Sequence, residues 1–345
     1  MKDKITVIIP AYNRPIHLQR TIEYASLLPY SFIIVDDSPT KPIIEKTLPS
    51  NVSYYYFHQN NFYDKVSFAI SKTNTPYVML CADDDFHLQS GVKTGIDFLD
   101  THSDYSCVHG VSLSFYKLKN AVLYNSLYSY GNNIDNVETE IFSRAKKYFS
   151  PFYPNYYSIH RIENLNDVFK YKMKYEVLGL IEFIFSFSAA IHGKFKVLPV
   201  VFHLREEAAF SAGNTTPLLP DIAIDEKSKH IFSDFKETLI KFYSEKTSSN
   251  ENKARIEVEA IIKSYLDWVK TGTQYHSVFS YAYLKRKYLK PLLPSFFSFL
   301  VKMKKQKQAN SNHNQKLFAQ LNLQKNSINL NDIKQIEDLI IQFNN

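Results

Sequence analysis

The chain has 345 residues, of which 45% are hydrophobic and 22% are charged, so it can bury a sizeable core and is not a disordered protein. Two cysteines are too few for a disulfide framework or a cysteine-only zinc site, and no apolar run reaches the roughly 18 residues of a membrane-spanning helix. The start of the sequence has no signal-peptide pattern, so we expect a cytoplasmic protein. The net charge of +7 comes from residues 216–345.

The first hundred residues alternate predicted strands with predicted helices. Short β-branched or apolar runs predict buried strands, and apolar residues at helical spacing predict the helices between them. The predicted strands are 5–9, 31–35, 52–57 and 77–82, and the predicted helices are 16–28, 63–72 and 90–101. This alternation predicts a mainly parallel sheet with helices on both faces.

The rest of the chain changes from mixed to helical patterns. We predict strands at 106–116, 121–130, 156–161 and 196–204, with helices at 137–149 and 178–192. A turn-rich stretch at 211–220 indicates a boundary, and beyond it we predict helices at 222–244, 252–269, 281–289 and 332–343, with a loose polar segment at 310–315. The chain is therefore predicted to have an α/β domain over residues 1–212 and a basic helical domain over residues 213–345.

Acidic residues follow two of the predicted strands. Asp36-Asp37 ends the second strand, and Asp83-Asp84-Asp85 ends the fourth. Ligands of parallel sheets bind beyond the carboxyl ends of the strands. Three adjacent carboxylates repel one another unless a cation lies among them, and Mg²⁺ or Mn²⁺ takes such oxygen ligands and bridges to diphosphates. Solvated turns at the ends of the two strands are the alternative.

Three segments together resemble family 2 glycosyltransferases. They are VIIPAYNR at 7–14, IIVDDS at 33–38 and YVMLCADDD at 77–85, and their order, strand-end position and spacing fit that family. The resemblance covers about the first 205 residues. It implies a GT-A fold, which is a Rossmann-like α/β fold, here followed by a C-terminal α-helical domain. It also implies inverting transfer from a nucleotide-activated sugar, with a UDP-sugar as the expected donor.

The resemblance implies a nucleotide pocket along the carboxyl ends of the strands. Tyr12 would lie against the nucleobase, Asp36 or Asp37 would bind the base, and Lys65 would contact base or phosphate. A structural ion pair is the alternative for the pair His160-Arg161. The full predicted set for binding the nucleotide-sugar is Pro10, Ala11, Tyr12, Arg14, Asp36, Asp37, Lys65, Asp83, Asp84, His160 and Arg161.

The predicted metal site departs from the family's usual Asp-x-Asp motif, because Ala82 occupies the first Asp position. The expected ligands of Mn²⁺ or Mg²⁺ are Asp84, Asp85 and His203. His203 ends a predicted strand, and a neutral imidazole can ligate Mn²⁺. A histidine bonded to the backbone is the alternative at this position.

The resemblance also implies a general base about eleven positions before a glycine, which for Gly193 gives Glu182. Glu182 has apolar neighbours on the predicted helix 178–192, and burial there would raise its pKa toward the range that suits a base. A glutamate at the helix edge that reaches solvent is the alternative, and Glu176 is the competing candidate base.

The C-terminal part has no acidic residue between Trp268 and Asn331. Within it, a Phe-rich block lies between two lysine-rich clusters. This pattern at 285–307 favours peripheral binding to an anionic membrane surface. A basic helical face packed on the catalytic domain is the alternative.

The sequence as a whole predicts a metal-assisted inverting glycosyltransferase with Glu182 as base and a glycan or lipid-linked acceptor. Synthesis of a surface polysaccharide, capsule or lipopolysaccharide is an expectation from the family alone. Ala82 and the shortened base motif leave a catalytically inactive nucleotide-binding scaffold as the alternative. We expect no nucleic-acid partner, because the strand-end carboxylates would repel one.

Overall fold

The computed structural model describes residues 1–42, 47–57, 61–119, 121–128, 134–171, 174–207, 219–271, 313–320 and 328–343. The predicted helix at 281–289, the predicted membrane-binding segment at 285–307 and the proposed boundary at residue 212 lie outside these residues. Among the helices that the structure describes, none combines the length and the apolar character needed to span a membrane.

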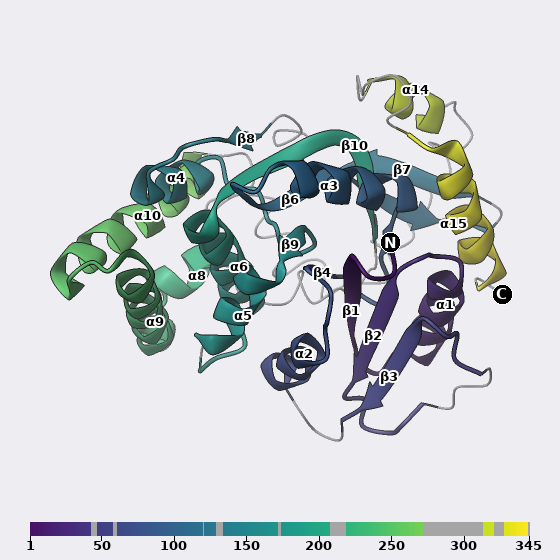
Figure 1. The fold of residues 1–345 in the computed structure, drawn as a ribbon, viewed down its shortest axis with the longest axis horizontal. Helices are drawn as coiled ribbons and strands as arrows, with labels where there is room; N and C mark the ends of the chain where they lie inside the picture. The colour runs from purple at the N-terminus through teal and green to yellow at the C-terminus, as the bar shows by residue number, and fades with distance from the viewer. Residues whose placement is uncertain are drawn as a thin grey trace.

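A mixed sheet forms the centre of the molecule (Figure 1). Its order is β3-β2-β1-β4-β9-β6-β10-β5, with β7 paired to β6 and β8 paired to β10. The strands are β1 Ile5–Ala11, β2 Ser31–Asp36, β3 Val52–Tyr56, β4 Tyr77–Leu80, β5 Phe86–His87, β6 Tyr105–Lys117, β7 Val122–Ser126, β8 Asp135–Asn136, β9 Ile159–Arg161 and β10 Lys194–Glu206.

Most of the sheet runs in one direction. Strands β3, β2, β1 and β4 are parallel, β9 is antiparallel to both β4 and β6, and β6 is parallel to β10. The carboxyl ends of β1, β2, β4, β6 and β10 therefore point the same way. The predicted α/β class with a mainly parallel sheet is confirmed.

Helices cover both faces of the sheet, because alternate residues of the buried strands point to opposite sides. In β1, Ile8 belongs to one apolar cluster, whereas Val7 and Ile9 belong to the other. The first cluster contains residues of α2 Phe62–Ser71, α4 Ile141–Tyr148, α5 Ile162–Lys170, α6 Leu178–His192, α8 Leu219–Ile224, α9 Lys229–Thr247 and α10 Glu251–Thr271. The second contains residues of α1 Pro15–Ser26, α3 Gln89–Thr101 and α15 Leu330–Gln342.

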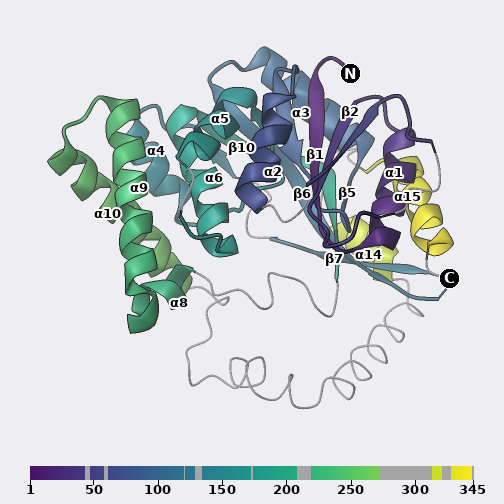
Figure 2. The same ribbon diagram turned by 90° about the horizontal axis from the view of Figure 1, so that it is seen from below.

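The C-terminal helices pack on the sheet domain at two places (Figures 1 and 2). Helices α9 and α10 lie beside α6 and α4, whereas α14 (His313–Gln320) lies along β7 and α15 lies against α1. The Asp332 carboxylate on α15 accepts hydrogen bonds from the backbone N–H and the hydroxyl of Ser90, at 2.9 and 2.7 Å. Helix α15 thereby caps the start of α3.

The structure corrects several predicted elements. The helix predicted at 222–244 is interrupted, because α8 ends at Ile224 and the Asp225 side chain caps a short 3-10 turn, Glu226–Ser228. The segment predicted to be loose begins α14, and His313 and Asn314 satisfy backbone groups of β7. Strands β7 and β9 and helix α4 are shorter than predicted.

Candidate active site

A cavity of about 340 Å³ opens where the carboxyl ends of β1 and β4 face the start of α6 and the end of β10. Many of the sequence-predicted site residues meet there, although they come from segments far apart in the chain. Those that line the cavity are Pro10, Tyr12, Arg14, Lys65, Asp83, Asp84, Asp85, Glu182 and His203.

The three aspartates form a buried turn between β4 and β5. Strand β5 pairs antiparallel with β10, and this register sets His203 opposite His87. Asp85 therefore lies beside the end of β10. Its Oδ2 is 3.1 Å from His203 Nε2, and its Oδ1 accepts the backbone N–H of Glu206 at 2.9 Å.

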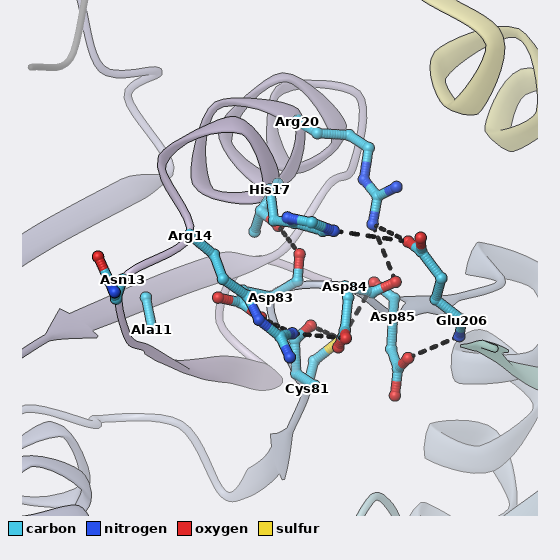
Figure 3. A network of polar contacts seen from close by, with 12 residues as sticks. Ala11, Asn13, Arg14, His17, Arg20, Cys81, Asp83, Asp84, Asp85 and Glu206 are labelled. Atoms are coloured by element: carbon cyan, nitrogen blue, oxygen red, sulfur yellow. Dashed lines mark hydrogen bonds and ion pairs between the residues drawn. The ribbon is translucent and has the colours of Figure 1, made fainter. Parts of the chain in front are cut away.

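Arg14, at the N-terminal end of α1, reaches the other two carboxylates (Figure 3). Its Nη1 lies 3.0 Å from Asp83 Oδ1 and 2.5 Å from Asp84 Oδ2. Burial, together with the neighbouring charge of Asp84, raises the pKa of Asp83 to about 7, although Arg14 opposes this shift.

Side chains of helix α1 also bind the backbone of the aspartate turn (Figure 3). The buried Arg20 guanidinium donates to the Asp84 carbonyl at 2.9 Å and to Glu206 Oε2 at 2.8 Å. The Thr21 hydroxyl donates to the Asp83 carbonyl at 2.8 Å. Glu206 in turn fixes Asp85, so α1, the turn and the end of β10 are connected in one network.

Glu182 lies on α6, lines the same cavity and is partly buried. Burial raises the pKa of Glu182 to about 7, and the nearby positive charge of Arg205 limits the rise. Helix α6 passes directly into β10 at Gly193, where a Cβ atom would lie 2.7 Å from the Asp104 carbonyl oxygen. This close approach requires glycine.

Residues 6–167 match the family model of glycosyl transferase family 2. These residues form a family 2 glycosyltransferase domain. The match confirms the family and the enzyme class that the sequence predicted, since the matched stretch contains the nucleotide-side motifs and the aspartate turn. No curated protein matches the chain.

Solved structures of S. aureus TarS are similar to this glycosyltransferase. One aligns with 16% identity and a TM-score of 0.46 over 84% of this chain and 46% of the TarS chain, so this chain spans less than half of that protein. TarS 1–349 in complex with UDP-GlcNAc aligns with 12% identity and a TM-score of 0.42, over 76% of this chain and 88% of the other. TarS 1–349 in complex with UDP aligns with 12% identity and a TM-score of 0.39, over 78% of this chain and 92% of the other.

Only some of the residues predicted for nucleotide binding line the cavity. Tyr12 lines the cavity with 55% of its surface exposed, as an aromatic ring ready to stack would be. Asp36, in contrast, is buried and accepts hydrogen bonds from Ser38 and from the Tyr54 hydroxyl. Asp37 is paired with Lys65. Neither aspartate lines the cavity, and Ala11 does not line it either.

His160 and Arg161, which were predicted to bind the nucleotide-sugar, do not line the cavity. They lie on β9, which is antiparallel to β4, and Arg161 pairs with Tyr77 at the start of β4 rather than its end. The Arg161 guanidinium donates to backbone carbonyls, among them that of Tyr105. His160 Nε2 contacts the carbonyl oxygen of Asn155 at 2.9 Å. Both residues support the fold.

Glu176, the competing base candidate, caps a helix. Its carboxylate accepts the backbone N–H groups of Phe62 and Tyr63, at 3.1 and 3.0 Å, at the start of α2. Such a cap satisfies donors that the first turn of a helix otherwise leaves free. Of the two candidate bases, Glu182 lines the cavity and Glu176 does not.

A divalent cation fits the donor set only in part. The described residues contain no group of three or more His, Cys, Asp or Glu side chains with metal-binding geometry. Asp85 and His203 form a two-donor set, and burial lowers the pKa of His203 to about 3, so its ring is neutral and able to ligate. Protein sites for Mg²⁺ commonly use one or two carboxylates and take further ligands from substrate phosphates.

Several residues that line the cavity or support it were not predicted from the sequence. Arg205 and Glu206 follow His203 on β10, Arg20 is one of many helical arginines, and Phe62 and Tyr156 resemble the other aromatic residues of the chain. Their participation depends on strand register and helix packing, which no local pattern encodes. The position of Arg205, two residues after His203 on the same strand, was the one usable signal.

Proposed function

We propose that this glycosyltransferase moves a sugar from a UDP-sugar donor to an acceptor hydroxyl with inversion at the anomeric carbon. The supporting observation is the position of Glu182, a partly buried acid of raised pKa, in the same cavity as the turn Asp83-Asp84-Asp85. A base and a charged turn that line one cavity suit a reaction in which the base activates the acceptor and the turn receives the leaving group.

In the proposed reaction, Glu182 takes the proton of the acceptor hydroxyl as its oxygen attacks the anomeric carbon. The bond between that carbon and the diphosphate oxygen breaks in the same displacement, so the configuration inverts. The pKa of about 7 suits this role. A large share of the carboxyl groups is ionised at neutral pH, and the carboxylate is a stronger base than one with an ordinary pKa.

The leaving diphosphate would lie at the aspartate turn. Arg14 is the cation best placed to meet it, since its guanidinium already bridges the turn and is one-third exposed. Asp85 and His203 would hold Mn²⁺ or Mg²⁺, with Asp84 next to them. Such an ion, when bound, stabilises the charge that develops on a departing diphosphate. Tyr12 would stack on the nucleobase at the mouth of the cavity.

The broader setting stays a prediction from the sequence. A glycan or lipid-linked acceptor, a role in surface polysaccharide synthesis, a cytoplasmic location and contact of 285–307 with an anionic membrane all belong to it. Co-sedimentation with anionic and neutral vesicles, with and without residues beyond 271, measures the membrane contact. Equal binding by both forms would contradict it.

The test of the proposed function combines binding with turnover. UDP should raise the melting temperature of the protein, and more so with Mn²⁺, because a ligand of the native state stabilises it by mass action. UDP-GlcNAc, the ligand of the TarS complex, is the first donor to try, with UDP release as the readout. Binding without release by any UDP-sugar would favour the inactive scaffold. If UDP does not bind and is not released from any donor, both the transferase function and the scaffold function are contradicted.

A further inference from the structure

The cavity has two walls of different chemistry. Arg14 and the turn Asp83-Asp84-Asp85 make one wall charged. Around Glu182 the lining is aromatic and aliphatic, and it includes Phe62, Pro154, Tyr156 and Leu178. We call these four residues the apolar wall. None of them has a part in the donor site proposed above.

The apolar wall is a built surface that faces the base. Leu178 and Glu182 are four residues apart on α6 and therefore lie on the same side of that helix. Glu176 ties the chain just before α6 to the backbone of Phe62, which keeps Phe62 beside Leu178. The Tyr156 ring centroid lies 6.1 Å from that of Phe62 and 4.9 Å from that of Phe185 on α6.

Acidic side chains outnumber basic ones in the described lining of the cavity, with Asp83, Asp84, Asp85, Glu182 and Glu206 against Arg14, Lys65 and Arg205. Among the described residues that line it, Arg14 pairs with two aspartates and Lys65 with Asp37. Arg205 donates to the Tyr128 hydroxyl at 3.5 Å, and its charge acts on both Glu182 and Asp85, so one cation faces two carboxylates.

An anionic group beside the acceptor hydroxyl would therefore lie near the Glu182 carboxylate. The described part of the cavity has no further cation to compensate its charge. Like charges a few ångströms apart in a partly buried site repel strongly. An uncharged sugar ring has the opposite fit, since its C–H face is apolar and its hydroxyl groups are polar. Aromatic side chains offer large apolar contact areas to such a face.

On the basis of the proposed transfer reaction, we propose that the apolar wall is the acceptor subsite and that it binds an uncharged sugar ring. The ring would pack its C–H face on Phe62 and Tyr156 and present one hydroxyl to Glu182. Phosphate or carboxylate groups next to the reacting hydroxyl would be rejected.

The test uses p-nitrophenyl glycosides of uncharged hexoses and N-acetylhexosamines, and the 6-phosphates of the same sugars, with UDP-GlcNAc and Mn²⁺. We expect at least one uncharged glycoside to raise UDP release above donor hydrolysis, and the phosphates to have no effect. Saturation-transfer NMR measures binding of the same probes directly. Stimulation by the phosphates that equals or exceeds that of the uncharged probes would overturn the proposal.

Two substitutions on α2 separate the subsite from the fold. Phe62→Ala should raise the acceptor KM about tenfold, the loss expected when one aromatic contact of about 1.4 kcal/mol is removed, while donor hydrolysis and UDP binding stay unchanged. Phe68→Ala is the matched control, because Phe68 is also partly buried on α2 but packs on Tyr55 and Phe57 away from the cavity. Equal effects of the two variants would overturn the proposal.

The outcomes also separate this proposal from the one on which it rests. If UDP neither binds nor is released from any donor, the proposed function fails. If donor hydrolysis is intact but no uncharged glycoside binds or stimulates UDP release, the acceptor assignment alone fails.

Discussion

The two walls of the cavity are held in place by different forces. On the charged wall, each aspartate is fixed by directional bonds: Thr21 and Arg20 hold the backbone of the turn, and Glu206 holds the side chain of Asp85. On the apolar wall, side chains are held by ring packing, as between Tyr156 and Phe185. Directional bonds fix geometry, whereas packing tolerates exchange of side chains. The charged wall is thus suited to constant chemistry and the apolar wall to changing specificity.

The largest expected effect separates chemistry from binding. Glu182→Gln should lower kcat for transfer by about a hundredfold or more, because it removes the base and keeps the side chain's shape. UDP affinity, measured by calorimetry, should barely change, since the charged wall is untouched. Glu176→Gln is the control and should reduce stability slightly while kcat is kept, as expected for a helix cap. A large loss of kcat in the control alone would reverse the assignment.

A second prediction concerns the metal. Asp85→Asn should remove the stimulation of UDP binding by Mn²⁺ and lower kcat at least about tenfold, the loss that even outer partners of a metal ligand produce. Asp84→Asn should also weaken Mn²⁺-dependent binding, and in addition release Arg14 from one of its two partners. Binding of UDP that is equally responsive to Mn²⁺ in wild type and in Asp85→Asn would contradict the metal assignment.

A third prediction tests the network behind the charged wall. Arg20→Gln breaks a buried ion pair and should cost about 3 kcal/mol of unfolding free energy, measured by urea denaturation. UDP affinity should fall as well, since the Asp84 carbonyl loses its donor. Arg255→Gln, which breaks exposed pairs on α10, is the matched control and should change stability by about 0.5 kcal/mol or less. A similarly small loss in Arg20→Gln would show that the network does not hold the wall.

The smallest expected effect is on the pH profile. The pKa of Glu182 is raised to about 7, so the base is charged only above that value, and kcat should rise with pH through about 7 and then level. The folded state binds this proton more tightly than the unfolded state does, so its stability should fall as pH rises between about 4.3 and 7. Arg205→Gln should move the kinetic limb to higher pH. A limb that persists in Glu182→Gln would belong to another group, such as Asp83.

The fold could be predicted from the sequence where a short-range pattern decides it. The β-branched runs ending at Pro10 and at Asp36 gave the parallel strands, and their ends gave the edge at which the site lies. The same reasoning predicted that His160 and Arg161 would lie at the cavity. They do not line it, because β9 is antiparallel to β4 and its end lies at the start of β4. Strand direction depends on partners distant in sequence, which a local pattern does not specify.

The candidate site divides in the same way. Asp83, Asp84 and Asp85 stand together in the sequence, so their joint role could be predicted. Glu206 reaches them only through the pairing of β5 with β10, and Tyr156 reaches Glu182 only through packing on α6. The position of Asp36 at a strand end predicted a ligand contact. In the structure its carboxylate accepts hydrogen bonds from Ser38 and Tyr54, and these contacts also depend on neighbours that the local pattern does not specify.

The contacts of α14 and α15 also bear on how the chain folds during synthesis. Backbone groups at Val122 and Tyr124 are satisfied by Asn314, and the start of α3 is capped by Asp332, about 190 and 240 positions further along the chain. During synthesis these backbone groups lack their hydrogen-bond partners, because most of the sheet leaves the ribosome before Asn314 and Asp332 do. Until then β7 is an open edge on which another chain could pair. Nascent or truncated chains should therefore aggregate more readily than the full-length protein.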